Sequence, residues 1–201
     1  MKNFDNRFLT DKIKLIAGTD EAGRGPLAGP VVAAAVIFSP EIFIEGVNDS
    51  KVLSEAKREK FFDEIVLRAE AHSVSIIPVE VIDEINILNA SLLAMKEAVN
   101  NLKVTPDLVL VDGNKGFSSN IPVIPIIKGD AKSFCIAAAS ILAKVTRDRL
   151  MKKLAAEYPI YFWEKNKGYP TKQHRELIKK YGSTSMHRKS FLKNILTELN
   201  G

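Results

Sequence analysis

Four carboxylate side chains stand where predicted strands end or a predicted helix begins. Asp20 and Glu21 close an apolar run typical of a strand, Asp112 closes a later run, and Asp130 precedes an alanine-rich segment. Ligands in α/β sheets gather outside the ends of strands, and carboxylate oxygens are the ligands that Mg²⁺ prefers. We therefore expect these four residues to form a magnesium site.

A site of this kind suits two metal ions. Two ions about 3.5–4 Å apart can activate an attacking water and stabilise the leaving 3′ oxygen of a phosphodiester, so no protein nucleophile is required. The sequence agrees with this chemistry, because it contains no Ser-His-Asp or Cys-His pattern. The carboxylates thus predict metal-dependent phosphodiester hydrolysis.

Each carboxylate also has an ordinary structural explanation. Asp130 is placed to cap the helix that follows it, and Asp112 begins an Asp-Gly-Asn sequence typical of a turn. The adjacent Asp20 and Glu21, at the entrance to a Gly-Arg-Gly turn, are harder to explain by packing. On the residues alone, this pair is the strongest indication of function.

The glycine-rich turn after the pair differs from a dinucleotide-binding loop. Gly23, Gly25 and Gly29 have the wrong spacing, Pro26 interrupts them, and no acidic residue follows where a ribose would bind. We therefore expect no nucleotide cofactor. Because glycines lack a Cβ, this backbone can approach a nucleic-acid strand closely, with Arg24 on a phosphate.

Basic side chains concentrate in the C-terminal part of the chain. Residues 141–201 hold 14 Lys or Arg and 5 Asp or Glu, whereas residues 1–140 hold 15 and 19. A basic surface attracts polyanions, because neutralised phosphates release their condensed counterions. Charge alone leaves two interpretations open, a nucleic-acid partner or a solvated helical surface.

Patterns along the chain predict a mixed α/β sheet covered by helices. Strands are expected at residues 14–19, 30–38, 73–79, 107–112 and 121–127. Helices are expected at 55–68 with Ser54 as the N-cap, at 80–102 as one long amphipathic helix, at 131–153, and at the basic segments 172–181 and 190–199.

Length and composition favour one domain, or one domain with a small appendage. The chain has 201 residues, of which 46% are apolar, enough for a buried core. No apolar run approaches the roughly eighteen residues that span a bilayer, and the start has no signal-peptide pattern. We expect a cytoplasmic protein in which the single cysteine, Cys135, is buried and forms no internal disulfide.

Seven motifs follow one another over almost the whole chain. They lie at residues 18–32, 48–54, 111–114, 128–133, 137–148, 168–171 and 187–191. They include Gly-Thr-Asp-Glu-Ala-Gly-Arg-Gly-Pro, Asn-Asp-Ser-Lys, Lys-Gly-Asp-Ala-Lys-Ser, Gly-Tyr-Pro-Thr and His-Arg-Lys-Ser-Phe. In this order they resemble the type 2 ribonucleases H, and among them the bacterial ribonuclease HII family. The resemblance implies a catalytic site for two Mg²⁺ or Mn²⁺ ions, formed by Asp20, Glu21, Asp112 and Asp130.

The resemblance also implies a group of residues that recognises a ribonucleotide. Gly23, Arg24 and Gly25 would contact the strand around it, and Tyr169 would pack on the sugar next to it. Because only the 2′-OH separates RNA from DNA, backbone groups of the turn and an aromatic ring form a reasonable sensor. Without the resemblance, Tyr169 would be expected to be an ordinary turn residue.

Further polar residues of the motifs are expected to steer the nucleic acid. These substrate contacts are Ser50, Lys51, Thr171, Lys172, His174 and Arg188. His174 and His187 could equally be surface or packing histidines, and neither is expected to bind metal or to act as a general base.

The implied fold is a ribonuclease H-like five-stranded mixed sheet flanked by helices. Residues 1–155 would form this catalytic core, and residues 156–201 a basic helical region that packs on the core and helps to clamp the duplex. Related HIII enzymes carry an additional N-terminal domain and lack the tyrosine, whereas here about 13 residues precede the first strand and Tyr169 is present. The HII branch is therefore favoured.

Together these features predict a metal-dependent endoribonuclease that hydrolyses the RNA strand of RNA–DNA hybrids. It would also incise ribonucleotide-containing duplex DNA 5′ of single ribonucleotides, leaving 3′-hydroxyl and 5′-phosphate ends, as ribonucleotide excision repair requires. We expect a monomer without a membrane or sliding-clamp partner, since residues 194–199 contain no aromatic anchor pair. The alternatives are another two-metal nuclease or recombinase, which would cut branched or all-DNA substrates, and a non-catalytic duplex-binding module.

Overall fold

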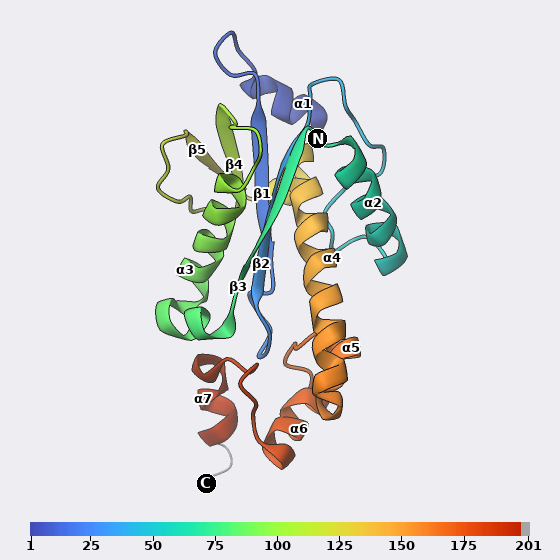
Figure 1. Ribbon diagram of the computed structural model, residues 1–201, viewed down its shortest axis with the longest axis vertical. Helices are drawn as coiled ribbons and strands as arrows, with labels where there is room; N and C mark the ends of the chain where they lie inside the picture. Colours follow the sequence, from blue (N-terminus) through green and yellow to red (C-terminus); the bar gives the residue numbers. More distant parts are fainter. Residues whose placement is uncertain (198–201) are drawn as a thin grey trace.

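Five strands form one mixed sheet at the centre of the molecule, in the order β3-β2-β1-β4-β5 (Figure 1). The structure, a computed structural model, describes residues 1–197 and the side chains of residues 1–193. β1 pairs antiparallel with β2 and parallel with β4, while β2–β3 is antiparallel and β4–β5 parallel. The predicted mixed sheet is confirmed, with these bounds: β1 (Ile16–Ala22), β2 (Val31–Ile37), β3 (Ala71–Ile77), β4 (Leu108–Asp112) and β5 (Val123–Ile126).

Helices cover both faces of the sheet, as Figure 1 shows. α3 (Val79–Asn100) packs on one face against β2 and β3, and α4 (Phe134–Glu157) packs on the other against β1 and β2. α2 (Glu55–Arg68) lies beside α4. The sheet is therefore buried between helical layers, and the candidate site must open at an end of its strands.

Small residues in the two central strands let the helices approach the sheet closely. Along β2, Ala33 and Ala35 face the core under α3, whereas Ala34 faces the core under α4, the alternation of a strand buried on both faces. In β1, a Cβ at Gly18 would lie 2.2 Å from the carbonyl carbon of Cys135 at the start of α4. α4 is thus seated directly on the strand that carries the first carboxylates.

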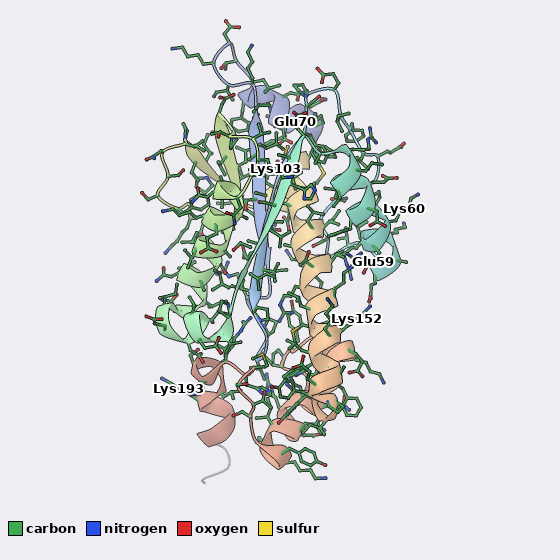
Figure 2. The ribbon with its side chains drawn as sticks, viewed as in Figure 1. Glu59, Lys60, Glu70, Lys103, Lys152 and Lys193 are labelled. Atoms are coloured by element: carbon green, nitrogen blue, oxygen red, sulfur yellow. The ribbon has the colours of Figure 1, made fainter. Side chains whose placement is uncertain are left out.

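α2 and α4 are joined side by side at the surface. α2 begins as predicted, with Ser54 Oγ accepting a backbone N–H at 3.3 Å. Lys152 Nζ lies 2.6 Å from Glu55 Oε1, and Arg149 forms an ion pair with Glu59. Glu59 and Lys152 mark this contact in Figure 2. Exposed ion pairs of this kind add little stability, so the apolar contacts beneath them hold the two helices together.

α3 differs from the prediction of one continuous helix. At Asn86, φ is 66° and ψ is 163°, so the helix is interrupted there. Asn86 Oδ1 accepts the N–H groups of Leu88 (3.0 Å) and Asn89 (3.1 Å) and thereby caps the helical segment that follows. The prediction was wrong because the apolar spacing continues through the break, where Asn86 adopts a backbone conformation that is unfavourable for residues with a Cβ and that its side-chain cap helps to hold.

α4 begins at Phe134 instead of residue 131. Its N-cap is Ser133, whose Oγ accepts the N–H of Ile136 at 3.2 Å. Asp130 lies in the preceding 3₁₀ turn, η2 (Gly129–Ala131). The structural explanation of Asp130 as the helix cap is therefore wrong, and its side chain serves another purpose.

The N-terminal segment, for which the sequence predicted no element, folds as α1 (Lys2–Asp5) and η1 (Asn6–Phe8). Asp5 Oδ2 accepts the N–H of Cys135 at 3.0 Å, which ties this segment to the start of α4. Cys135 is buried, as predicted, and burial raises the pKa of its thiol.

The C-terminal region lies at the far end of α4, in the lower part of Figure 1. It consists of η3 (Pro159–Tyr161), α5 (Trp163–Asn166), α6 (Lys172–Tyr181) and α7 (Lys189–Thr197). Its apolar residues form a small core of their own, which includes side chains of the glycine-rich loop at residues 27–28. α4 runs without interruption across the predicted boundary at residue 155, so a single helix joins the two regions. The predicted end of the last helix, at residue 199, lies outside the described residues.

Within residues 1–197, the helices are too short or too polar to cross a membrane.

Candidate active site

The sheet brings three of the four predicted carboxylates together. Asp20 lies near the end of β1 and Asp112 is the last residue of β4, and these parallel strands are neighbours in which Thr19 is opposite Val111. Asp130 comes from η2, the turn after β5. One oxygen of each aspartate lies within 4.8 Å of the others. Residues far apart in sequence thus converge because three neighbouring segments end at the same edge.

Backbone hydrogen bonds hold two of these side chains in place. Asp112 Oδ1 accepts the N–H of Gly129 at 2.6 Å and that of Asp130 at 3.3 Å, so β4 fixes the turn that carries the third carboxylate. A Cβ at Gly129 would lie 2.6 Å from Ile136 Cδ1 and 3.2 Å from Asp112 Oδ1. The turn therefore needs glycine to approach this close. Asp20 Oδ1 accepts the N–H of Glu21 at 2.7 Å.

Glu21 occupies a different position from the other three. Adjacent residues of a strand point to opposite faces, and Glu21 accordingly lies outside the three-aspartate cluster. Its Oε1 is 3.4 Å from Arg24 Nη1, and it lines the same cleft as Asp20 and Asp112. The four predicted residues therefore form a tight group of three with one carboxylate beside it.

Burial and mutual repulsion raise the pKa values of these carboxylates. For Asp20, burial is the largest cause and the neighbouring Glu21 and Asp112 add to it, so its pKa lies well above the ordinary value. Burial also raises the pKa of Glu21, against the lowering effect of Arg24. Burial and then Asp130 raise the pKa of Asp112. A divalent cation between these groups would remove their repulsion.

The donor set fits such a cation. All three clustered donors are carboxylate oxygens, which suit Mg²⁺ or Mn²⁺, and among the described side chains no thiolate or imidazole joins them. Lys51 Nζ lies 3.0 Å from Asp130 Oδ2 at the rim of the cluster, and its side chain is 74% exposed. It offsets part of the negative charge but leaves the interior of the group for a metal.

A cleft of about 320 Å³ opens beside the carboxylates. It contains most of the residues that the sequence predicted as substrate contacts, namely Gly23, Arg24, Gly25, Ser50, Lys51 and Tyr169. Two further lining residues, Ser140 and Lys144, were not predicted. Both lie in a motif of α4, four residues apart and hence on one helix face, a signal that could have identified them.

The new residues are fixed by specific contacts. The hydroxyl oxygens of Ser140 and Ser50 are 2.7 Å apart. Lys144 Nζ is 2.7 Å from Asp148 Oδ1 and 5.9 Å from the centre of the Tyr169 ring.

Tyr169 faces the glycine turn across the cleft. It is 40% exposed, and a Cβ at Gly25 would lie 3.7 Å from its ring atom Cε1. The Tyr169 N–H donates to the carbonyl oxygen of Asn166 at 2.8 Å. The Tyr169 ring is therefore accessible from the cleft, while a hydrogen bond fixes the backbone of this residue.

Thr171 and Arg188, which the sequence also predicted as substrate contacts, lie outside this cleft. Thr171 Oγ1 caps α6 by accepting the N–H of His174 at 3.1 Å, and neither Thr171 nor Arg188 lines the cleft. Arg188 is fully buried, and its guanidinium donates to backbone carbonyls of the glycine-rich loop. These contacts hold the glycine-rich loop in place, and the protein encloses the Arg188 guanidinium. His174 and His187 are buried too, in agreement with the packing alternative, while Lys172 is exposed.

Comparison with known proteins gives a consistent result. The model of the family described as ribonuclease HII matches residues 17–194. Ribonuclease HII of Caldicellulosiruptor bescii is 54% identical over 197 residues, covering 96% of this chain and 94% of the relative. That of Acetivibrio thermocellus is 57% identical over 183 residues, covering 91% and 72%.

Solved structures agree with the fold. The ribonuclease H2 of Pyrococcus horikoshii is similar with a TM-score of 0.76 and 31% identity, covering 92% of this chain and 99% of that one. Ribonuclease HII of Archaeoglobus fulgidus, solved in a complex with PCNA, has a TM-score of 0.73 and 28% identity, covering 87% and 94%. Bst-RNase HIII, solved with Mn²⁺, has a TM-score of 0.69, 17% identity and coverages of 94% and 71%, a likeness of fold alone.

Proposed function

The chain belongs to the ribonuclease HII family, and on this premise we propose that it incises duplex DNA on the 5′ side of single ribonucleotides, leaving 3′-hydroxyl and 5′-phosphate ends. It is an endoribonuclease with ribonuclease H activity on RNA–DNA hybrids. Incision at single ribonucleotides would initiate their removal from DNA.

The observation that carries the proposal is the position of Tyr169 beside the glycine turn, in the cleft that Asp20, Glu21 and Asp112 also line. A ribose bound beside Tyr169 and against the Gly23–Gly25 turn would present its 2′-OH to backbone groups, and that hydroxyl is what separates RNA from DNA. The glycine turn and Tyr169 share this cleft with carboxylates of the candidate metal site. Recognition of the ribonucleotide would therefore place the adjacent phosphodiester over that site.

We assign Asp20, Asp112 and Asp130 as ligands of a divalent cation, Mg²⁺ or Mn²⁺, and Glu21 as the carboxylate beside a second one. When bound, such ions supply an activated water and stabilise the leaving oxygen. The family is dependent on divalent metals, and the buried aspartates provide a fitting donor set.

The remaining cleft residues would hold the substrate. Arg24, Lys51 and Lys144 carry positive charge at its rim and would bind phosphates, whereas Ser50 would contact the strand from its hydrogen bond with Ser140. We further propose that residues 1–155 form the catalytic core and that residues 156–201 support the duplex. The tail at residues 194–199, which shows no clamp-binding motif, lies outside the described side chains.

A duplex with one embedded ribonucleotide tests the proposal directly. The protein is incubated with it in Mg²⁺, in Mn²⁺ and in EDTA, and the product ends are mapped. We expect metal-dependent incision on the 5′ side of the ribonucleotide and none of an all-DNA duplex of the same sequence.

Other outcomes would identify the alternatives. Cutting of all-DNA or branched substrates would favour another two-metal nuclease. Salt-sensitive duplex binding without turnover in either metal would favour a non-catalytic module.

A further inference from the structure

Three segments far apart in sequence are hydrogen-bonded to one another behind the cleft. The Leu27 N–H donates to the Gly168 carbonyl, the Arg188 N–H to the Leu27 carbonyl, and the Gly29 N–H to the Met186 carbonyl, each at 2.8 Å. The glycine-rich loop is therefore bonded on one side to the turn at Gly168 and Tyr169, and on the other to the segment that contains His187 and Arg188.

The Arg188 side chain is a backbone support. Nη2 donates to the carbonyls of Gly23 (2.6 Å) and Gly29 (2.8 Å), Nη1 to that of Arg24 (3.1 Å), and Nε again to Gly29 (3.0 Å). Arg147 Nη2 supports the same loop through the Ala28 carbonyl at 3.0 Å. A guanidinium is suited to this arrangement, because its donors form a rigid planar fork.

These hydrogen bonds set the orientation of the glycine turn. In a trans peptide, C=O and N–H point in opposite directions. Because the Gly23 and Arg24 carbonyls accept from Arg188, the N–H groups of Arg24 and Gly25 point away from it, and both residues line the cleft. Arg188 thus presents two adjacent donors without touching the ligand.

The His187 side chain is connected to Tyr169 through His174. His187 Nδ1 accepts the Thr184 N–H at 3.0 Å, so its proton is on Nε2, which lies 3.2 Å from His174 Nε2. The single lone pair of His174 Nε2 is shared between this N–H and that of Trp163 Nε1, 3.1 Å away, which places the His174 proton on Nδ1. That Nδ1–H donates to the Tyr169 carbonyl at 2.9 Å. A continuous chain of hydrogen bonds therefore runs from His187 to the backbone of the tyrosine.

We propose that Arg188 and His187 are positioning residues, which fix the glycine turn and Tyr169 in the relative positions at which both contact a ribonucleotide. Arg188 acts on the turn directly, and His187 acts on Tyr169 through His174. Since the two residues are adjacent in sequence, one short segment positions both the glycine turn and Tyr169. Asp83 of α3 holds this segment to the core by accepting the Lys189 N–H at 2.8 Å. The inference rests on the proposed function.

The first experiment separates support from direct phosphate contact. Arg188→Met and Arg188→Lys are compared with Arg68→Met, a change at an exposed arginine at the end of α2. We expect both Arg188 variants to lower the single-turnover incision rate about tenfold or more, because a misplacement of about 1 Å is costly. Binding of the ribonucleotide duplex in EDTA should keep its salt dependence.

A phosphate contact would give a different pattern. The slope of log affinity against log salt would fall by about 0.9 for Arg188→Met, and lysine would restore much of the function. Either result would overturn the assignment of Arg188. Melting temperatures measured for every variant identify a fold that is lost.

The second experiment does not depend on Arg188. His187→Phe retains a ring beside Tyr161 and Trp163 but removes the hydrogen-bonding nitrogens. We expect it to slow incision about tenfold in the unmodified protein and to have little further effect in the Tyr169→Ala background. His72→Phe, at an exposed position of β3, is the matched control.

The combined outcomes distinguish the two ideas. Multiplication of the His187 and Tyr169 losses would overturn the positioning role, because residues that act through one another are not additive. Absence of incision by the unmodified protein would count against the proposed function instead.

Discussion

The carboxylate cluster and the support behind the glycine turn are both buried and polar, but they are built in opposite ways. Asp20, Asp112 and Asp130 converge with like charge and raised pKa values at Asp20 and Asp112. Arg147 and Arg188 are instead surrounded by carbonyl oxygens that accept their N–H groups. This difference in how the buried charges are surrounded separates the groups suited to bind a ligand from those that support the fold. Repulsion between converging carboxylates marks the metal site, whereas guanidinium groups hydrogen-bonded to carbonyl oxygens mark its scaffold.

The largest expected effect separates activity from stability at Asp20. Asp20→Asn should lower incision on the order of a thousandfold, because a metal contributes several kcal/mol of transition-state stabilisation. In EDTA the same variant should melt at a higher temperature, since burial raises the Asp20 pKa and its ionised form destabilises the fold at neutral pH. Incision assays and calorimetry in EDTA check both. A lower melting temperature would show that the charge is compensated.

A substitution in the scaffold should lower the stability of the fold, whereas Asp20→Asn should raise it. Arg147→Met removes a donor from the carbonyls of Ala28, Pro30 and Lys167. Pro30 keeps Arg188 Nη2 at 3.2 Å, and each buried group left unsatisfied costs about 1–3 kcal/mol. We expect the free energy of unfolding in urea to fall by about 3–5 kcal/mol. A loss below about 1 kcal/mol, as at an exposed arginine such as Arg68, would mean that water replaces the guanidinium.

The two regions also differ in how far the sequence predicts them. Asp20 and Asp112 could be identified locally, because apolar runs that end in a carboxylate are visible in any strand, and the sheet then brings such ends together. The break in α3 at Asn86 could not be identified from the sequence, because the apolar spacing continues through it. Nor could the role of Arg188, whose acceptors lie at residues 23–30 and are main-chain atoms common to every residue type.

Tyr169 connects the two regions and should show an intermediate effect. Tyr169→Ala should reduce incision at a single ribonucleotide by about ten- to a hundredfold, as expected when a positioned sugar is released. Duplex binding should change much less, because phosphate contacts dominate affinity. Rates and binding constants on the same duplex provide the test, with Tyr181→Ala, an exposed tyrosine of α6, as the control. Equal losses of rate and binding would assign Tyr169 to affinity alone.

The smallest expected effect is a difference in pH response between the regions. Burial, and then His174, lower the pKa of His187 to about 4, below its ordinary value of 6.5. The stability that neutral His187 contributes is therefore complete above pH 6.5 and is lost as the pH falls toward 4, by at most about 1.4 kcal/mol per pH unit for one proton. Asp20 behaves oppositely, because its raised pKa makes the fold more stable as the carboxyl is protonated. Urea unfolding at pH 7 and pH 5 in EDTA should thus show a smaller acid loss in His187→Phe than in the unmodified protein, and a larger one in Asp20→Asn. If both variants shift in the same direction, the two regions do not titrate as opposites, and the division into a metal site of mutually repelling carboxylates and a hydrogen-bonded scaffold fails.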